Sequence, residues 1–436
     1  MKNFVLKTRL ALMLLLEFAV WGAYLTSLGS YLINAGLANH IGSFYAVQGI
    51  VSIFTPAIFG IIADRWIPAQ KMLSLSHFFA GAFMIGAGVY GYLNPQPAFG
   101  PLFTLYAFSV AFFMPTIGLA NSVSYNALDR AGLDTVKHFP PIRIFGTIGF
   151  IILMLFVNFT GFQNTYAQLI TSGVMSLLLT LYALTMPDCP TNKSKAKKSL
   201  GEALGLNAFK LFKDRNMAVF FIFSMLLGVS LQITNGFANP FIQAFGKDTL
   251  IGQNANALIS LSQMSETLCI LLIPFFLRKF GIKVVMLMAM MAWVLRFGLF
   301  GIGSATPMGV TFLVLSMIVY GVAFDFFNVS GSLYVDQQTD VSIRSSAQGL
   351  FMIMTNGIGA TIGTLGAQAI ISHLVFSQPE GEKQIAGWHT SWLIFAAYAL
   401  VVGILFFFIF KNKPAKTSVS LKEVAEDDPA GMIDTL

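Results

Sequence analysis

The chain has 436 residues, of which 56% are hydrophobic and 10% are charged, and its formal net charge is +7. Its mean hydropathy is +0.73. This small number of charged residues cannot cover a water-facing surface. The composition therefore excludes a soluble protein and indicates an integral membrane protein.

Apolar stretches recur along nearly the whole chain. Each is long enough for a helix that crosses a hydrocarbon core of about 30 Å, which needs about 20 residues. A transmembrane β-barrel is excluded because the apolar runs are continuous and do not alternate with polar residues. We therefore predict an all-α polytopic membrane protein with twelve transmembrane helices, over residues 9–33, 41–63, 71–93, 101–127, 141–160, 165–186, 216–243, 255–278, 283–304, 308–335, 345–373 and 389–411.

The basic residues predict the orientation of these spans. Of the 26 Lys and Arg residues, all except Lys247, Lys383 and Arg296 fall on the side of the membrane that holds the N-terminus. Because basic residues concentrate in cytoplasmic segments, both termini are predicted to be cytoplasmic, in a bacterial inner membrane. The positive charge thus follows from topology, and we expect no nucleic-acid partner. The first span is too long for a cleaved signal peptide and is expected to be retained.

A basic segment near the middle of the chain, "TNKSKAKKS", separates six spans from six. The strings "IRIFGTIGF", from Ile142, and "IRSSAQGLF", from Ile343, occupy equivalent places in the two halves, as in a duplicated transporter. We predict an N-terminal six-helix bundle (1–186), a cytoplasmic linker (187–215) and a pseudo-symmetric C-terminal six-helix bundle (216–411). The acidic tail (412–436) is predicted to be disordered.

The loop after the second span, "GIIADRWIPAQK", contains Gly60, Asp64 and Arg65. This spacing resembles the signature loop of the major facilitator superfamily and predicts a conformational role, in which Gly60 permits close helix approach and Asp64 bonds to a neighbouring helix end. The alternative is an ordinary cytoplasmic turn. The sequence contains no phosphate-binding loop, zinc spacing or nucleophile elbow, so we expect no enzyme activity, no metal and no cofactor.

Five charged residues lie inside the predicted spans: Glu17, Arg143, Glu266, Arg296 and Asp325. A charge at mid-bilayer costs about 2.5–3.5 kcal/mol on insertion scales, so each needs an explanation. Arg143 begins its span, where an interfacial anchor and a functional role are equally good interpretations. Arg296 is expected to reach the outer interface. Glu266 and Asp325 lie near the middle of their spans.

Polar and aromatic side chains share helix faces with these two acids. Interhelical bonding, at about 0.6 kcal/mol per contact, is one explanation. A shared watery cavity accounts for more of them and suits a neutral, flat, polar solute, because amides can pair with base or sugar edges and aromatic rings can stack on a base. A strongly anionic solute is disfavoured because only two arginines lie in the spans. The residues are Gln232, Asn235, Gln263, Glu266, Tyr320, Phe324, Asp325 and Asn328.

Several long strings resemble the bacterial nucleoside:proton symporters of the major facilitator superfamily, of the nucleoside and xanthosine permease type. They include "FPPIRIFGTIGF", "SQMSET" and "LSMIVYGVAFDFFNVSGS". The resemblance covers about residues 10–411 and implies a monomeric twelve-helix transporter of the major facilitator fold that takes up nucleosides with protons by alternating access. It also implies the substrate-binding residues, which at matching positions are Arg143, Thr147, Phe150, Gln232, Asn235, Gln263, Glu266, Tyr320, Phe324 and Asp325.

Residue 17 departs from this resemblance, because Glu17 stands where family members have a neutral glutamine. Glu17 is expected to face the cavity from the first helix, either as an added proton site or paired with a cation and silent, and we favour the second. For proton coupling, Asp325 and Glu266 are both candidates, since burial favours an uncharged carboxyl group.

Two other functions remain open at this point. One is transport of a different neutral solute on the same fold, such as a sugar, an oligosaccharide or a peptidoglycan fragment. The other is a membrane receptor that transports nothing. The two matching halves and the mid-span acids favour a transporter.

Overall fold

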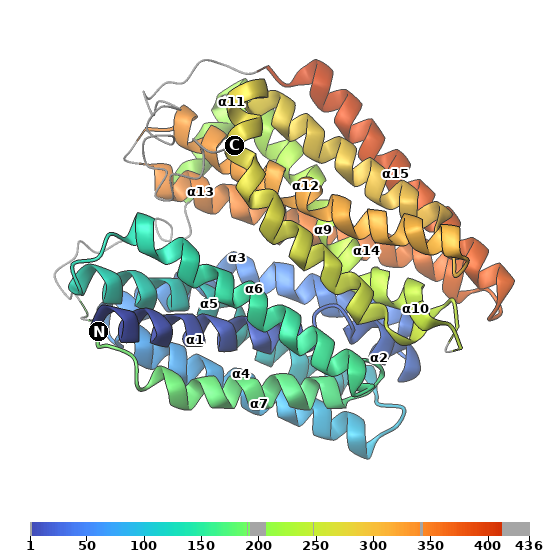
Figure 1. The fold of residues 1–436 in the computed structure, drawn as a ribbon, viewed down its shortest axis with the longest axis horizontal. Helices are drawn as coiled ribbons and strands as arrows, with labels where there is room; N and C mark the ends of the chain where they lie inside the picture. Colours follow the sequence, from blue (N-terminus) through green and yellow to red (C-terminus); the bar gives the residue numbers. More distant parts are fainter. Residues whose placement is uncertain (1, 190, 192–205, 247, 341–342, 412–436) are drawn as a thin grey trace.

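The computed structural model describes residues 2–189, 191, 206–246, 248–340 and 343–411, and every regular element within these ranges is a helix. Figure 1 shows two groups of helices, one from the first half of the sequence (blue to green) and one from the second half (light green to red). The predicted all-α fold with two six-helix groups is confirmed. The exact boundaries predicted for the bundles and the linker remain predictions.

The first half provides six spans. The first of them was predicted to be continuous, but a turn divides it, because backbone bonds of the i→i+3 type, such as Ser27 N–H to Tyr24 O (3.1 Å), interrupt the helix. The helices are α1 (Lys2–Gly22), α2 (Leu28–Asn34), α3 (Ile41–Arg65), α4 (Ala69–Leu93), α5 (Phe99–Arg130), α6 (Thr135–Phe159) and α7 (Ala167–Ala183), with short 3₁₀ turns η1 (Ala38–His40) and η2 (Phe162–Asn164).

The second half provides the other six spans. Its eleventh span combines α-helical and π-helical segments, and the π-helical part η4 carries Thr355 and Asn356. The elements are η3 (Leu206–Lys213), α9 (Arg215–Gln243), α10 (Leu250–Gln253), α11 (Ala255–Ile302), α12 (Pro307–Gln338), α13 (Arg344–Met352), η4 (Ile353–Gly359), α14 (Ala360–Ile371), η5 (Ser372–Phe376) and α15 (Glu382–Ile409).

Two of the predicted spans lie within α11. The backbone breaks at Gly281, with φ 74° and ψ 166°, between the predicted spans 255–278 and 283–304. Residues with a side chain rarely adopt this φ, so glycine suits the tight reversal. With α11 divided here, the described helices account for twelve spans.

Close packing of α1 on α6 positions part of the candidate site. A Cβ atom added to Gly149 of α6 would lie 2.0 Å from the carbonyl oxygen of Leu15 in α1. Only a glycine lets the two backbones approach so closely. This contact fixes the N-terminal part of α6 beside Phe18 and Trp21.

Hydrogen bonds join the two halves at the end of the molecule that holds α2 and α10, opposite the N-terminus in Figure 1. Ser30 Oγ donates to Asn239 Oδ1 (2.6 Å), Thr26 Oγ1 donates to Asn256 Oδ1 (2.9 Å), and Asn158 Nδ2 donates to Asn254 Oδ1 (2.8 Å). We call Ser30, Asn239 and Asn256 the amide junction. Asn239 Nδ2 completes it with a bond to Asn256 Oδ1 (2.7 Å).

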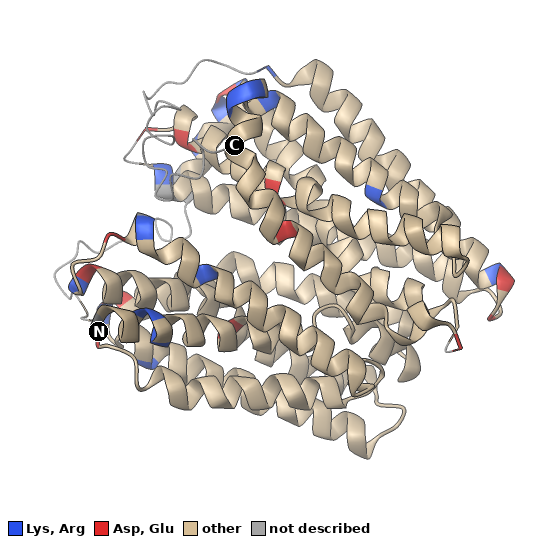
Figure 2. Ribbon diagram, in the orientation of Figure 1, with Lys and Arg blue, Asp and Glu red and all other residues tan. Residues whose placement is uncertain are grey.

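The outer surface of the helices is suited to lipid. Nine helices of the described chain are long and apolar enough to cross a membrane, one of them being the whole of α11. Large apolar side chains such as Leu181, Leu268 and Phe408 are exposed. Figure 2 shows that Lys and Arg gather at the end of the bundles where the N-terminus lies, with few charges along the middle of the helices.

Candidate functional site

The aromatic and acidic side chains of α12 lie next to each other. The rings of Tyr320 and Phe324 are stacked, with centroids 5.7 Å apart and planes inclined by 5°. Asp325 is the next residue and is buried, with 5% of its surface exposed, and its Oδ2 has no hydrogen-bond partner. A buried carboxylate oxygen without a donor is costly when charged, so this position can hold a proton or receive a donor from a ligand.

The neighbouring helix α11 brings its polar face to the same place. Ser265 Oγ donates to the Ile318 carbonyl oxygen of α12, so the two helices are in direct contact. Gln263 lies close to the hydroxyl of Tyr320, and Glu266 lies within electrostatic range of both Tyr320 and Asp325. Glu266 and Gln263 are half-buried. The structure thus brings the two predicted proton-coupling carboxylates together.

On α9, the two predicted amides bond to each other. Asn235 Nδ2 donates to Gln232 Oε1 at 2.7 Å, and Gln232 is buried while Asn235 is half-buried. This bond uses one donor and one acceptor and leaves the Gln232 NH₂ and the Asn235 oxygen available to a ligand.

The first half of the chain contributes α6. The guanidinium of Arg143 lies over the ring of Phe18, with Cζ 3.9 Å from the ring centroid, and within electrostatic range of Glu266 and Glu17. Phe150 is buried and meets Trp21 edge-on at 6.4 Å. The orientation of Arg143 is therefore toward α1 and the second half, which favours the functional interpretation over the interfacial anchor.

Thr147 lies on α6 one turn beyond Arg143 and is half-buried. Its predicted binding role rests on its place on the α6 face that also carries Arg143 and Phe150.

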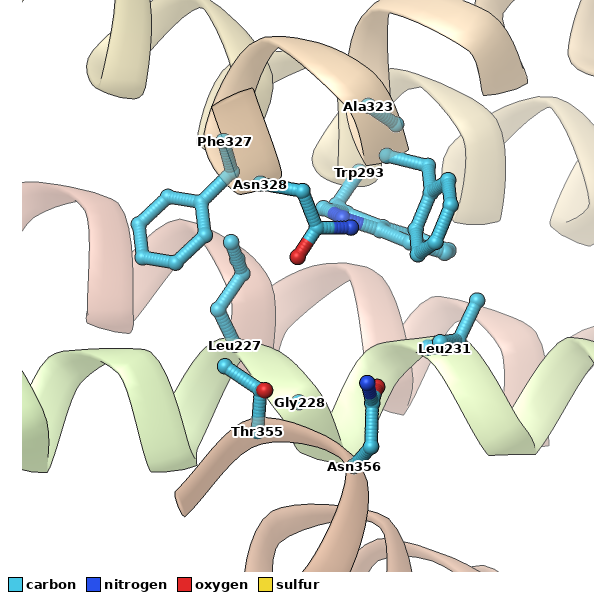
Figure 3. Close-up of a pocket in the computed structure, with 10 residues that line it drawn as sticks. Leu227, Gly228, Leu231, Trp293, Ala323, Phe327, Asn328, Thr355 and Asn356 are labelled. Atoms are coloured by element: carbon cyan, nitrogen blue, oxygen red, sulfur yellow. The ribbon is translucent and has the colours of Figure 1, made fainter. Parts of the chain in front are cut away.

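A small pocket opens beside Phe324, between α9, α11, α12 and η4 (Figure 3). The amides of Asn328 and Asn356 both point into it, with Thr355 and Trp293 nearby. The sequence indicated Asn328 but missed the other three. Thr355 and Asn356 had no signal of their own, because nothing in the sequence predicts that η4 is a π-helix, a feature frequent at functional sites.

Arg296 does not reach the outer interface, contrary to the expectation from sequence. It is 2% exposed, and its Nη1 donates to the Ser316 carbonyl oxygen at 2.6 Å. Its guanidinium lies over the Tyr320 ring, with Cζ 4.5 Å from the centroid. The expectation failed because distance along a helix axis does not tell whether a side chain faces lipid or protein. The Arg296 guanidinium therefore packs on one face of the Tyr320 ring.

The predicted conformational loop lies at the far end of α3, away from these residues. No atom lies within 4 Å of a Cβ built on Gly60, so the close helix approach expected there is not made in this structure. Asp64 is exposed and Arg65 is half-buried.

Glu17 does not face the cavity, which corrects that part of the prediction. It is fully buried, and its carboxylate contacts His77 on α4 and Thr116 on α5. His77 was missed from sequence, where a lone histidine in an apolar span carries no spacing signal. The pairing expected for Glu17 therefore matches the geometry, with His77 as its partner.

Comparison with known proteins identifies the family. A family model described as "Nucleoside H+ symporter" matches residues 4–415. The xanthosine permease of Escherichia coli (strain K12) is 46% identical over 410 residues, covering 92% of this chain and 95% of the permease. Nucleoside permease NupG of the same strain is 43% identical over 427 residues, covering 96% of this chain and 99% of that protein.

Comparison with solved structures gives the same assignment. The crystal structure of nucleoside transporter NupG is 44% identical and matches with a TM-score of 0.84, covering 94% of this chain and 100% of that chain. A bacterial homologue of the lysosomal transporter Spinster, at 15% identity and a TM-score of 0.67, shares the fold alone. These relatives are transporters and not enzymes. Because the family model and both permeases match nearly the whole chain, the protein belongs to the nucleoside H+ symporter family.

Proposed function

We propose that this protein takes up nucleosides together with protons across the bacterial inner membrane by alternating access. The observation that carries the proposal is the stacked pair Tyr320 and Phe324 directly beside Asp325, in a chain that belongs to a nucleoside symporter family. Stacked rings offer a flat apolar surface to a base, and carboxylates accept hydrogen bonds from ribose hydroxyls.

The substrate contacts come from both halves. On α9, α11 and α12, amides and carboxylates surround the aromatic pair, and on α6 Arg143 approaches Glu266 from the other half. A ligand held between α6 and α12 would therefore link the halves. The proposed binding residues are Arg143, Thr147, Phe150, Gln232, Asn235, Gln263, Glu266, Tyr320, Phe324 and Asp325.

Asp325 and Glu266 are the proposed proton carriers. They lie within electrostatic range of each other, so two negative charges here repel, and one proton shared by the pair relieves that repulsion. A proton that moves inward down a potential of 100 mV supplies about 2.3 kcal/mol, which corresponds to roughly 50-fold accumulation of a solute.

The amide junction is proposed to act as the outer gate. If both termini are cytoplasmic, as the distribution of basic residues supports, the hydrogen bonds of Ser30, Asn239 and Asn256 join the halves at the outer end. Rocking of the bundles 1–186 and 216–411 about the central site would break these bonds and open the outer side. We propose that the unit that does this is a monomer.

Uptake into proteoliposomes tests this function. Labelled uridine should accumulate when an inward proton gradient and an inside-negative potential are imposed, and a protonophore should abolish accumulation. Unlabelled adenosine should compete, whereas neutral sugars should not. Competition by sugars or oligosaccharides without any by nucleosides would instead support a carrier of another neutral solute, and absence of all flux would support a receptor.

A further inference from the structure

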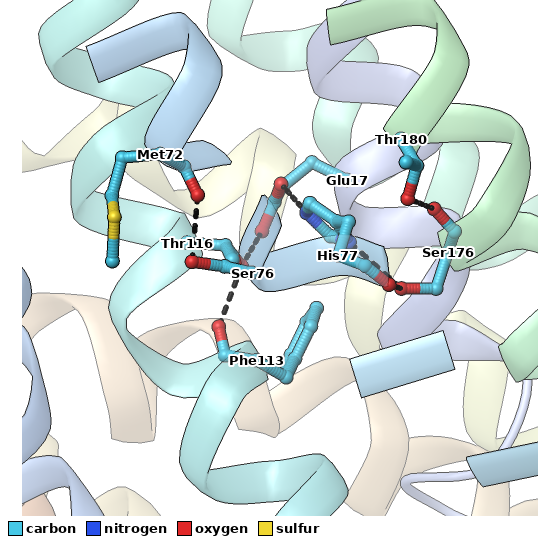
Figure 4. A network of polar contacts seen from close by, with 8 residues as sticks. All are labelled: Glu17, Met72, Ser76, His77, Phe113, Thr116, Ser176 and Thr180. Carbon is cyan, nitrogen blue, oxygen red and sulfur yellow. Dashed lines mark hydrogen bonds and ion pairs between the residues drawn. The ribbon is translucent and has the colours of Figure 1, made fainter. Parts of the chain in front are cut away.

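A second group of titratable side chains lies inside the first half, away from the candidate site. Glu17 of α1 and His77 of α4 are both fully buried, and their Oε2 and Nε2 atoms lie 2.8 Å apart. Thr116 of α5 and Ser176 of α7 flank them, so four helices meet at this point (Figure 4). The transport function proposed above does not use this cluster.

The hydrogen atoms in the cluster can be counted. Thr116 Oγ1 lies 2.6 Å from Glu17 Oε1 and 2.5 Å from the Phe113 carbonyl oxygen, so its one hydrogen is shared between two acceptors. Ser176 Oγ lies 2.9 Å from both His77 Nδ1 and the His77 carbonyl oxygen. When Ser176 donates to this carbonyl oxygen, Nδ1 must donate to Ser176 Oγ. Nε2 must then donate to Glu17 Oε2, because a carboxylate only accepts. A neutral imidazole has one hydrogen and leaves one of these contacts without a proton.

The charge balance gives the same result. A deprotonated Glu17 beside a neutral His77 is a net negative charge in a fully buried place, which is costly unless it is paired. One additional proton makes the pair neutral overall, and it resides on the imidazole, which is intrinsically more basic than a carboxylate.

Other charged groups on the helices around the pair do not replace this proton. Arg143 of α6 lies within electrostatic range of Glu17, but it is also shared with Glu266 and stacked on Phe18. The other titratable Lys, Arg, His, Asp and Glu side chains that the structure describes on these helices lie toward the helix ends: Lys7, Arg9, Lys71, Asp129, Arg130, Lys137 and His138.

Aromatic contacts connect the cluster to the candidate site. The His77 ring meets Phe113 at 6.0 Å, and Phe113 meets Trp21 at 6.0 Å. Trp21 in turn meets Phe150 edge-on at 6.4 Å. Phe18, the residue after Glu17, makes a cation–π contact with the guanidinium of Arg143. The position of α1 relative to α4 therefore sets the positions of Arg143 and Phe150, two of the three predicted binding residues of α6.

We propose that Glu17 and His77 form a proton-binding site of the first half, separate from the carboxylates of α11 and α12. The site holds one proton as an imidazolium on His77 next to the Glu17 carboxylate. The hydrogen bonds of this pair anchor α1 to α4, α5 and α7, and so position the α1 side chains that contact Arg143 and Phe150.

Nitrogen NMR of the full-length protein, labelled with ¹⁵N-histidine in lipid nanodiscs, tests the site without any substrate. The chain has five histidines, and the His77 signals are those that His77→Gln removes. At pH 7 both ring nitrogens of His77 should carry a hydrogen in the natural protein and only one in Glu17→Gln. A singly protonated ring in the natural protein, or identical spectra in the two proteins, would overturn the proposal.

Ser176→Ala provides a second test that leaves both titratable groups in place. It removes the acceptor of the Nδ1 hydrogen, so the ¹⁵N signal of Nδ1 should shift, while the signal of Nε2, which still donates to Glu17, should stay near its position in the natural protein. An unchanged Nδ1 signal in this variant would contradict the hydrogen-bond arrangement on which the site depends.

The effect of the Glu17–His77 site on transport is a further expectation, and it rests on the proposed function. Glu17→Ala should raise the KM for uridine about tenfold with little change in kcat, since loss of the anchor weakens binding contacts. Glu17→Gln should restore most of the affinity, because its amide can still bond to Thr116 and His77. An unchanged KM in a folded Glu17→Ala protein argues against the positioning role. If the natural protein transports no nucleoside, the proposed function fails while the NMR result still decides the proton site.

Discussion

The guanidinium of Arg296 lies over the ring of Tyr320, with Cζ 4.5 Å from its centroid, and both side chains are buried. Tyr320 is stacked in turn on Phe324. A buried cation thus supports one ring of the aromatic pair that we propose to hold the base. Arg296 is itself held by the Ser316 carbonyl oxygen, so the stack is fixed to the backbone of α12.

Arg296→Met should therefore destabilise the protein and weaken substrate binding. The change removes a charge-assisted hydrogen bond worth about 1.5–3 kcal/mol and the cation under Tyr320. Thermal unfolding in detergent should show a lower Tm, and the KM for uridine should increase. Arg278→Met, which alters an exposed arginine of the same helix, is the control and should leave both values near those of the natural protein. Equal Tm values for the two variants would show that Arg296 has no supporting role.

Asp325→Asn should separate binding from proton coupling. If Asp325 carries the proton, the variant should retain exchange of labelled for unlabelled uridine but lose the roughly 50-fold accumulation that 100 mV can support. Counterflow and gradient-driven uptake, measured in the same proteoliposomes, give the two quantities. Asp129→Asn, at an exposed position of α5, should retain both. Unchanged accumulation in Asp325→Asn would remove Asp325 from the proton path and leave Glu266 as the candidate.

Phe324→Ala should weaken nucleoside binding. Loss of a ring that stacks on a base costs about 1–3 kcal/mol, so the KM for uridine should increase about fivefold or more. Phe324→Tyr keeps the ring and should bind nearly as well as the natural protein. Phe408→Ala removes a ring that is 72% exposed on α15 and serves as the control. A similar KM for Phe324→Ala and Phe408→Ala would place the base elsewhere.

Asn239→Leu should loosen the end of the molecule that we propose faces outward. Asn239 is fully buried and bonds to Ser30, Asn256 and Gln243, so a leucine removes these bonds, including the one that Ser30 Oγ donates across the junction of the halves. A cysteine introduced at Asn235, in a protein whose Cys189 and Cys269 are replaced by serine, should react severalfold faster with a membrane-impermeant thiol reagent applied outside. Gln378→Leu, at an exposed position, should not change the labelling rate. A rate for Asn239→Leu no higher than this control would argue against an outer gate at Asn239.

The sequence by itself determined the fold class and the polar helix faces. Long apolar runs specify membrane helices because lipid cannot satisfy free backbone groups. The period of the helix places Tyr320 with Phe324 and Gln263 with Glu266 on shared faces. These are local properties, since each depends on residues within two turns of one another.

The tertiary structure decided which charged side chains face inward and what they meet. Arg296 was expected at the interface and Glu17 at the cavity, yet Arg296 lies under Tyr320 and Glu17 pairs with His77 of another helix. Neither partner can be identified from spacing, because helix rotation and packing set contacts between residues far apart in the chain. The same reason applies to Asn356, which lines the pocket from the π-helix η4, where η4 packs against α9.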